Sequence, residues 1–184
     1  MSILFGHYVA DSGDIEVFGQ PLPPGNPRIA LDAGIGMVHQ EFSLIPGFTA
    51  TENILLNRES LNNSLLIDIF GPRISTLDRA TMGDRATKAI DKLGVSLDPK
   101  MLVKEMPVGH KQFTEIAREL CRENVKLIVL DEPTAVLTES EAEVLLASLR
   151  LLSAEGIAII FISHRLREIV ELCDRVVVLR DGHK

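Results

Sequence analysis

The chain has 184 residues, the length of one α/β domain and enough to bury a hydrophobic core. Its 26 acidic and 19 basic residues give a formal net charge of −7, which argues against binding to nucleic acid. No apolar stretch reaches the length of a transmembrane helix, so the sequence does not predict insertion into a membrane.

Residues 1–50 combine turns with one expected strand. Turn-forming residues stand at Gly13 and at Pro23–Gly25. The apolar run Ile35–Val38 predicts a strand that would deliver Gln40 beyond its carboxyl end. Taken alone, Gln40 is most simply an exposed loop residue.

The middle of the chain, residues 51–108, predicts helices in short pieces. Residues 51–52 would open the first of them, and residues 80–93 form an amphipathic pattern. The inward positions of that pattern are Ala86, Ile90 and Leu93. Residues 62–73 are less regular and are interpreted as a loop. A further helix is expected over residues 111–123, with Pro107 near its start.

Two adjacent acids follow an apolar run in the second half of the chain. Leu127–Leu130 predicts a strand buried on both faces, and Asp131 and Glu132 come directly after it. Ligands of open α/β sheets gather at the carboxyl ends of strands. Magnesium prefers oxygen ligands, and a second carboxylate can orient or deprotonate a water molecule. The alternative is that Asp131 caps a turn while Glu132 is solvated.

A second apolar run, Ala158–Ile162, is followed by His164. Residues 139–153 between the two runs carry leucines at helical spacing, so the segment predicts a βαβ unit. Such crossovers are right-handed and join parallel strands. Asp131, Glu132 and His164 would therefore lie at one edge of one sheet.

These motifs resemble those of ABC-type ATPases. Leu127–Thr138, LIVLDEPTAVLT, resembles the Walker B strand and D-loop, and Phe161–His164, FISH, resembles the strand that ends in the switch histidine. Gly34–Leu56 is similar to the Q-loop region of the bacterial sugar-importer branch, in its first ATPase half. Residues 3–18 resemble the end of the helix after the phosphate loop and the turn into an antiparallel β subdomain, and residues 174–182 a late sheet strand.

The resemblance implies a fold class and an organisation. We expect an α/β P-loop NTPase domain of the ABC ATPase type, truncated at the N-terminus, with residues 1–184 forming one partial domain. Residues 51–108 would form its helical subdomain, and residues 1–50 and 109–184 its catalytic core with a remnant of the antiparallel β subdomain. Because the family's phosphate-loop strand lies between the strands at residues 158–162 and 175–179, both would lack a neighbour, and we expect a marginal or aggregation-prone polypeptide.

The resemblance also implies roles for individual residues, with ATP and Mg²⁺ as the bound groups. Glu132 would act as general base or water orienter, and Asp131 would hold magnesium through a water molecule. His164 would contact the γ-phosphate. Gln40 would touch magnesium or the attacking water.

The sequence departs from the family pattern in two places. It contains no G-x-x-x-x-G-K-S/T phosphate-binding loop, or Walker A motif, so we expect the chain to be inactive by itself. The family signature L-S-x-G-Q stands here as Met106–His110, with Pro107 replacing serine and His110 replacing glutamine. Gly109, His110 and Lys111 would keep a helix start that attracts an anion, contacting nucleotide on an opposite subunit.

The implied function is ATP hydrolysis that powers a bacterial ABC importer for sugars or nucleosides. Its partners would be permease subunits, docked on the helical subdomain, and a second ATPase domain in a head-to-tail dimer. A solute-binding protein would take part indirectly, and the subunit would lie on the cytoplasmic face of the inner membrane. Two alternatives stay open: a non-catalytic module that lends its altered signature helix to a partner ATPase, and a soluble ABC ATPase not linked to transport.

Overall fold

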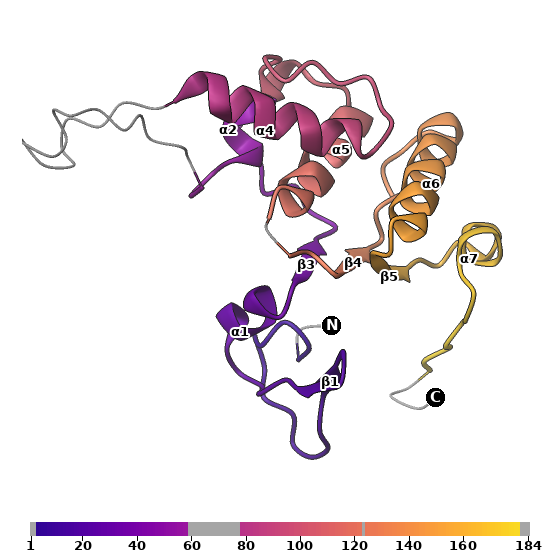
Figure 1. Ribbon diagram of the computed structural model, residues 1–184. Coiled ribbons are helices and arrows are strands. Elements are labelled where there is room, and N and C mark those ends of the chain that lie inside the picture. Colours follow the sequence, from indigo (N-terminus) through magenta and orange to yellow (C-terminus); the bar gives the residue numbers. More distant parts are fainter. Residues whose placement is uncertain (1–2, 59–77, 123, 181–184) are drawn as a thin grey trace, which may run out of the picture. The chain divides into compact units, whose positions relative to one another are not determined.

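A computed structural model describes residues 3–58, 78–122 and 124–180 (Figure 1). The chain divides into two compact units, of which the first combines residues 1–40 with 124–184 and the second spans residues 41–123. The boundaries expected for the helical subdomain, residues 51 and 108, both fall inside the second unit.

A three-stranded parallel sheet forms the centre of the first unit. Its strand order is β3 (Ile35–Val38), β4 (Leu127–Asp131), β5 (Ala158–Ile162). Ile35 lies opposite Leu127 in the register, and Asp131 lies opposite Ile162. All of β3 and the first four residues of β4 are buried, whereas β5 at the edge of the sheet is exposed at Ala158 and half-buried over its other four residues. The three predicted strands are therefore confirmed, and they run parallel as the βαβ pattern requires.

Helix α6 (Glu139–Ala154) connects β4 to β5 and confirms the predicted crossover. A capping box starts it: the Thr138 hydroxyl accepts a hydrogen bond from the Glu141 backbone N–H, and the Glu141 carboxylate accepts one from the Thr138 backbone N–H. Gly156 follows the helix at φ +91°, a conformation that favours glycine. The apolar side of α6 is buried through Leu145, Leu146, Leu149 and Leu152.

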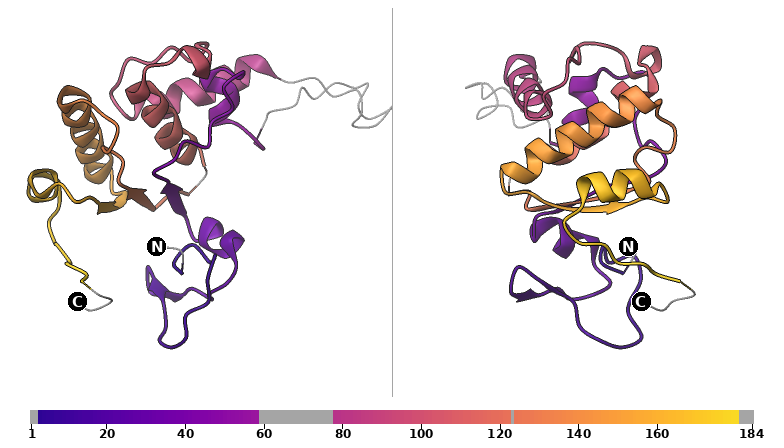
Figure 2. Two further views of the ribbon diagram at one scale, coloured as in Figure 1. Left: turned by 180° about the vertical axis from the view of Figure 1, so that it is seen from behind. Right: turned by 90° about the vertical axis from the view of Figure 1, so that its right-hand side faces the viewer.

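The two faces of the sheet are covered by different parts of the first unit. A short antiparallel pair, β1 (Glu16–Val17) and β2 (Gln20–Pro21), precedes α1 (Pro27–Asp32). One face of the sheet contributes to a cluster of Phe5, Leu22, Ala30, Ile35, Met37, Leu127 and Val129. Because side chains alternate along a strand, Ile128 and Leu130 face the opposite side, where α6 lies (Figure 2).

The N-terminal region differs from the expectation in one respect. Residues 3–18 are expected to hold the end of a helix and the turn into an antiparallel β subdomain. The antiparallel pair β1–β2 is present, but residues 3–6 form a turn rather than the end of a helix. The Gly6 N–H donates to the Ile3 carbonyl over 3.0 Å, and Gly6 has φ +75°, so the backbone turns away from a helical path.

The second unit is helical, as predicted. Its described elements are α2 (Ala50–Ile54), α4 (Arg79–Asp91), the 3-10 turn η2 (Val103–Glu105) and α5 (Val108–Leu120). The three inward positions predicted for the amphipathic segment are all buried: Ala86, Ile90 and Leu93. The loop predicted at residues 62–73 lies outside the described residues.

The late sheet strand predicted within residues 174–182 is wrong for the part that the structure describes. Helix α7 (Leu166–Leu172) follows β5, and no strand is assigned to residues 175–179. Four apolar side chains of this segment are more than half exposed: Val176, Val177, Val178 and Leu179. A strand forms by pairing with a neighbour, and β-propensity alone does not hold one in place. Among the described residues, none of the helices combines the length and apolar character needed to span a bilayer.

Candidate functional site

The carboxyl ends of β4 and β5 carry the predicted acidic pair and the histidine. Asp131 is the last residue of β4, and Glu132 follows it. The Glu132 N–H donates a hydrogen bond of 2.9 Å to the Ile162 carbonyl, which prolongs the pairing of the two strands by one residue. Both polar segments therefore leave the sheet side by side.

Glu132 and His164 are in contact at this edge. The Nδ1 atom of His164 lies 3.3 Å from Oε1 of Glu132, and the two form a hydrogen bond when Nδ1 carries the proton. The His164 side chain is 69% exposed and that of Glu132 is 32% exposed. The imidazole is thus held near the carboxylate while remaining accessible to a ligand.

The backbone at Glu132 is strained. Glu132 has φ +47°, a left-handed conformation that is costly for residues other than glycine. Its carbonyl accepts a hydrogen bond of 3.1 Å from the Ala135 N–H, which closes a turn directly after the strand. Strained residues of this kind cluster at functional sites. The turn directs the Glu132 side chain to the sheet edge, where it meets His164.

Gln40 and Asp131 follow or end strands at the same edge of the sheet as this pair. Val38 lies opposite Leu130 in the register, so Gln40, an exposed residue just after β3, leaves the sheet at the same edge as Asp131. Amide and carboxylate oxygens suit magnesium, which commonly completes its shell with water and substrate phosphates. The described residues contain no cluster of three His, Cys, Asp or Glu side chains able to hold a metal by themselves. The donor set fits a nucleotide-bound magnesium.

A buried carboxylate that the sequence analysis missed lies behind the edge. The side chain of Glu168, in the first turn of α7, accepts hydrogen bonds from the hydroxyls of Thr134 (2.7 Å) and Ser163 (3.2 Å). Its other oxygen lies 3.1 Å from the Arg165 guanidinium. The only signal in the sequence was an acid near the start of an apolar helix, which by itself indicates no more than a favourable helix dipole interaction.

The signature-like segment starts α5 three residues earlier than predicted. Pro107 occupies the N-cap position, and no side chain caps the helix there. Gly109, His110 and Lys111 therefore lie within the first turn, where Gly109 is buried and the other two are half-buried. The Lys111 N–H donates to the Pro107 carbonyl over 3.2 Å, whereas the N–H groups before it, including those of Gly109 and His110, have no partner within the helix, so this end suits an anion. These residues belong to the second unit.

An ion pair between the buried Glu115 and the half-buried Arg118 holds Ser43 in the second unit. The fully buried Glu115 accepts a hydrogen bond of 2.6 Å from the Ser43 N–H, and Arg118 donates to the Ser43 carbonyl over 3.1 Å. Glu115 and Arg118 lie 3.5 Å apart. Both backbone groups of Ser43 are thus bonded to side chains of α5. Sequence patterns did not indicate this contact.

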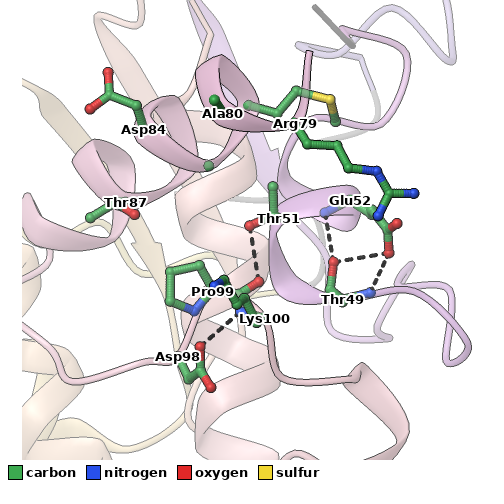
Figure 3. A pocket seen from close by; sticks show the side chains of 12 residues that line it. Thr49, Thr51, Glu52, Arg79, Ala80, Asp84, Thr87, Asp98, Pro99 and Lys100 are labelled. Atoms are coloured by element: carbon green, nitrogen blue, oxygen red, sulfur yellow. Dashed lines mark hydrogen bonds between the residues drawn. The ribbon is translucent and has the colours of Figure 1, made fainter. Parts of the chain in front are cut away.

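A pocket of about 620 Å³ also lies in the second unit (Figure 3). Its walls come from the start of α2, from α4 and from residues 98–100. At one side, the hydrogen bonds between Thr49 and Glu52 cap α2 (Figure 3). None of the predicted site residues lines this pocket.

Comparison with known proteins identifies the family. A family model described as ABC transporter matches residues 1–135. The chain belongs to the ABC transporter family. This ABC transporter chain is 44% identical over 184 residues to the "Ribose import ATP-binding protein RbsA" of Hahella chejuensis, covering 100% of the chain and 34% of the relative. It is 39% identical over 182 residues to the "Galactose/methyl galactoside import ATP-binding protein MglA" of Treponema denticola, covering 99% of the chain and 34% of the relative.

The ABC transporter chain spans about a third of the length of these curated relatives. Among solved structures, MJ1267, an ATP-binding cassette of an ABC transporter, matches with a TM-score of 0.80 and 25% identity, covering 98% of this chain and 71% of that one. A dimeric post-hydrolysis state of the cassette MJ0796 bound to ADP and Pi matches with a TM-score of 0.69 and 22% identity, covering 94% and 71%. The ABC ATPase fold predicted from the sequence is confirmed.

Proposed function

We propose that this chain is part of an ATP-hydrolysing subunit that powers a bacterial importer of sugars or nucleosides. The observation that carries the proposal is the contact between Glu132 and His164 at the carboxyl edge of a parallel sheet. Ligands of such sheets bind at this edge. The names of the relatives, which are import ATP-binding proteins for ribose and galactose, favour import over a soluble ATPase unconnected with transport.

Each residue at the edge has a part in this proposal. Glu132 orients the attacking water and accepts its proton. Its carboxylate is 32% exposed, so a water molecule beside a bound nucleotide can reach it. His164 donates a hydrogen bond toward the terminal phosphate. Asp131 and Gln40 hold magnesium, directly or through water, and the ion when bound supplies positive charge next to the phosphates.

The chain by itself is inactive in this proposal. Its sequence contains no G-x-x-x-x-G-K-S/T motif, whose backbone N–H groups and lysine bind the nucleotide phosphates in P-loop ATPases. The residues at the sheet edge alone therefore do not supply enough binding energy for ATP in this proposal.

The proposed partners follow the family. The helical second unit docks on permease subunits, and a second ATPase domain packs head-to-tail so that Gly109, His110 and Lys111 face the nucleotide of the opposite domain. A solute-binding protein delivers the solute to the permease, and the assembly places this subunit on the cytoplasmic face of the inner membrane.

A second candidate function rests on the start of α5. Pro107 leaves the helix without a side-chain cap, so the serine hydroxyl of the family signature has no equivalent here. The chain would then be a non-catalytic module that presents only the amides of this helix to a partner's nucleotide. Nucleotide-dependent co-purification with a complete ATPase subunit, without hydrolysis at the Glu132 site, is the result that favours it.

Equilibrium titration with labelled ATP and Mg²⁺ tests the proposal. We expect no saturable binding in the micromolar range to the 184-residue chain. We expect binding to a loop-complemented chain, in which a β-strand and a G-x-x-x-x-G-K-S/T loop precede residue 3. Asp131→Ala should weaken that binding in the presence of Mg²⁺ and leave it unchanged in EDTA. Binding by the Asp131→Ala variant that is as tight as that of the unsubstituted chain in the presence of Mg²⁺ would contradict the proposed metal site.

A further inference from the structure

We propose that Glu168 is a positioning residue, whose buried carboxylate holds the segments that carry Glu132 and His164 in one relative arrangement. The two groups in contact at the sheet edge come from separate segments. Thr134 lies two residues after Glu132, and Ser163 and Arg165 flank His164 on either side. The importance of this arrangement for ATP hydrolysis rests on the proposed function, whereas the arrangement itself does not.

The hydrogen bonds of Glu168 reach both segments at once. Its Oε2 accepts from Thr134 Oγ1 at 2.7 Å and from Ser163 Oγ at 3.2 Å, and its Oε1 lies 3.1 Å from the Arg165 guanidinium. Ser163 Oγ in turn accepts from the Arg165 N–H at 3.0 Å, which closes the turn around His164. One carboxylate therefore bridges the turn after β4 and the turn after β5.

The buried hydrogen bonds of Glu168, rather than the exposed contact between Glu132 and His164, fix the arrangement of the two segments. Glu168 is 7% exposed, and a buried carboxylate is costly unless its oxygens are hydrogen-bonded. The three side chains that satisfy it belong to the two segments, so displacement of either one leaves a buried charge with fewer partners. The contact between Glu132 and His164 is exposed, and exposed pairs contribute little. The buried bonds therefore place the exposed pair.

The other charged residues of α7, Arg167 and Glu171, form ion pairs with α6 and not with the sheet edge. Arg167 pairs with Glu139 at 2.8 Å, and Glu171 pairs with Arg150 at 2.9 Å. Both partners belong to α6, and both pairs are exposed. These pairs tie α7 to α6, whereas Glu168 ties α7 to the sheet edge. Glu171 therefore offers a matched control on the same helix.

Nuclear magnetic resonance of the isotope-labelled chain tests the inference. The variants are Glu168→Gln, Thr134→Val and Thr134→Ser, with Glu171→Gln as the control. Two signals are followed: the imidazole resonances of His164 and the hydrogen exchange of the Arg165 amide. We expect Glu168→Gln and Thr134→Val to shift the His164 signals and to speed the exchange by about 10-fold, the loss of one buried hydrogen bond.

Thr134→Ser keeps a hydroxyl at this position, so it should retain the hydrogen bond to Glu168 that Thr134→Val removes. Thr134→Ser is expected to keep the wild-type His164 signals and exchange rate, and Glu171→Gln should leave both unchanged. The inference is overturned if Glu168→Gln leaves His164 and the Arg165 amide as they are, or if Glu171→Gln changes them equally. Should Glu168→Gln fail to fold, the two Thr134 variants decide. The inference is supported if only Thr134→Val changes the His164 signals and the Arg165 exchange, and contradicted if Thr134→Val and Thr134→Ser give the same spectra.

No nucleotide is present in this experiment. A chain that never binds ATP would contradict the proposed function and leave the coupling of the two turns intact. Unaltered His164 signals in a chain that does bind ATP would contradict the positioning role alone. The two outcomes are therefore distinguishable.

Discussion

The Nδ1 atom of His164 lies 3.3 Å from Oε1 of Glu132, although 32 positions separate the two residues in the sequence. Parallel pairing of β4 with β5 is what brings them together, since the Glu132 N–H bonds to the Ile162 carbonyl at the end of the neighbouring strand. A carboxylate and an imidazole at the open edge of a sheet are suited to proton transfer and to contact with an anion. The proposed chemistry depends on this pair.

Replacement of the Glu132 carboxylate should slow ATP hydrolysis while leaving ATP binding nearly unchanged. Glu132→Gln in the loop-complemented chain, paired with the second ATPase half of a relative, is expected to lower the hydrolysis rate by about 10² to 10⁴, because general base catalysis contributes that much. Affinity for ATP and Mg²⁺ should change little, since Gln keeps the size of the side chain. Steady-state phosphate release and equilibrium binding measure the two quantities. A Gln variant that hydrolyses ATP at the wild-type rate would exclude Glu132 as the base.

The ion pair that holds Ser43 should be important for the stability of the second unit. Glu115→Ala removes the buried carboxylate that accepts from the Ser43 N–H and pairs with Arg118, which keeps Glu119 at 3.8 Å. The loss of such a buried hydrogen bond costs about 1 to 3 kcal/mol. Urea unfolding measures the free energy, and hydrogen exchange of the Ser43 amide reports the lost bond directly. Asp84→Asn, which breaks the exposed pair with Lys88, is the control and should change stability by about 0.5 kcal/mol or less. Similar unfolding curves for Glu115→Ala and the control would show that the hydrogen bonds to Ser43 do not contribute to the stability of the second unit.

The capping box of α2 predicts a pH dependence. The Thr49 backbone N–H donates to the Glu52 carboxylate and holds its pKa below the ordinary value. A carboxyl group with a lowered pKa in the folded state contributes stability above its unfolded pKa, about 4.3, and loses that contribution as the pH falls through the folded pKa. Glu52→Gln should therefore flatten the loss of stability below about pH 4.3. Titration of the Glu52 side-chain resonance gives its pKa, and a value at or above the ordinary one would refute this explanation.

The exposed apolar segment near the C-terminal end should promote self-association. Val177 is 60% exposed and Leu179 is 73% exposed, and the neighbouring strand β5 lies at the edge of the sheet. Unpaired edges and exposed apolar runs invite pairing with another chain. We expect the wild-type chain to form larger species in sedimentation velocity as its concentration rises, and Val177→Lys with Leu179→Lys to suppress them. A monomeric wild-type chain with a sharp two-state melt would contradict this expectation.

The elements that the sequence predicted best are those with a clear period and their own end signals. Residues 127–130 and 158–162 are continuous apolar runs, and the helix between them has leucines at helical spacing with Thr138 at its start. Their polar ends could be placed together because parallel strands share an edge. Topology predicted that Glu132 and His164 share this edge, but not that their side chains lie 3.3 Å apart.

The features that the sequence did not predict depend on tertiary contacts. Residues 175–179 have strand propensity, but a strand requires a neighbour to bond with. The roles of Glu168 and Glu115 are invisible in the sequence because their partners lie far away along the chain, at Thr134 and Ser43. Helix α1 had a local signal, with Asn26 as its cap and proline at its first turn, but it is too short to show a period.

Paramagnetic relaxation tests the central claim most directly. Mn²⁺ accepts the same oxygen ligands as Mg²⁺, so Mn²⁺ with ATP should bind the loop-complemented chain at the same place. We predict that the amide signals of Gln40, Asp131, Glu132 and His164 broaden first, while that of Leu152 in the core of α6 remains sharp. Broadening that spares these four residues while the nucleotide is bound would show that the sheet edge is not the metal and nucleotide site.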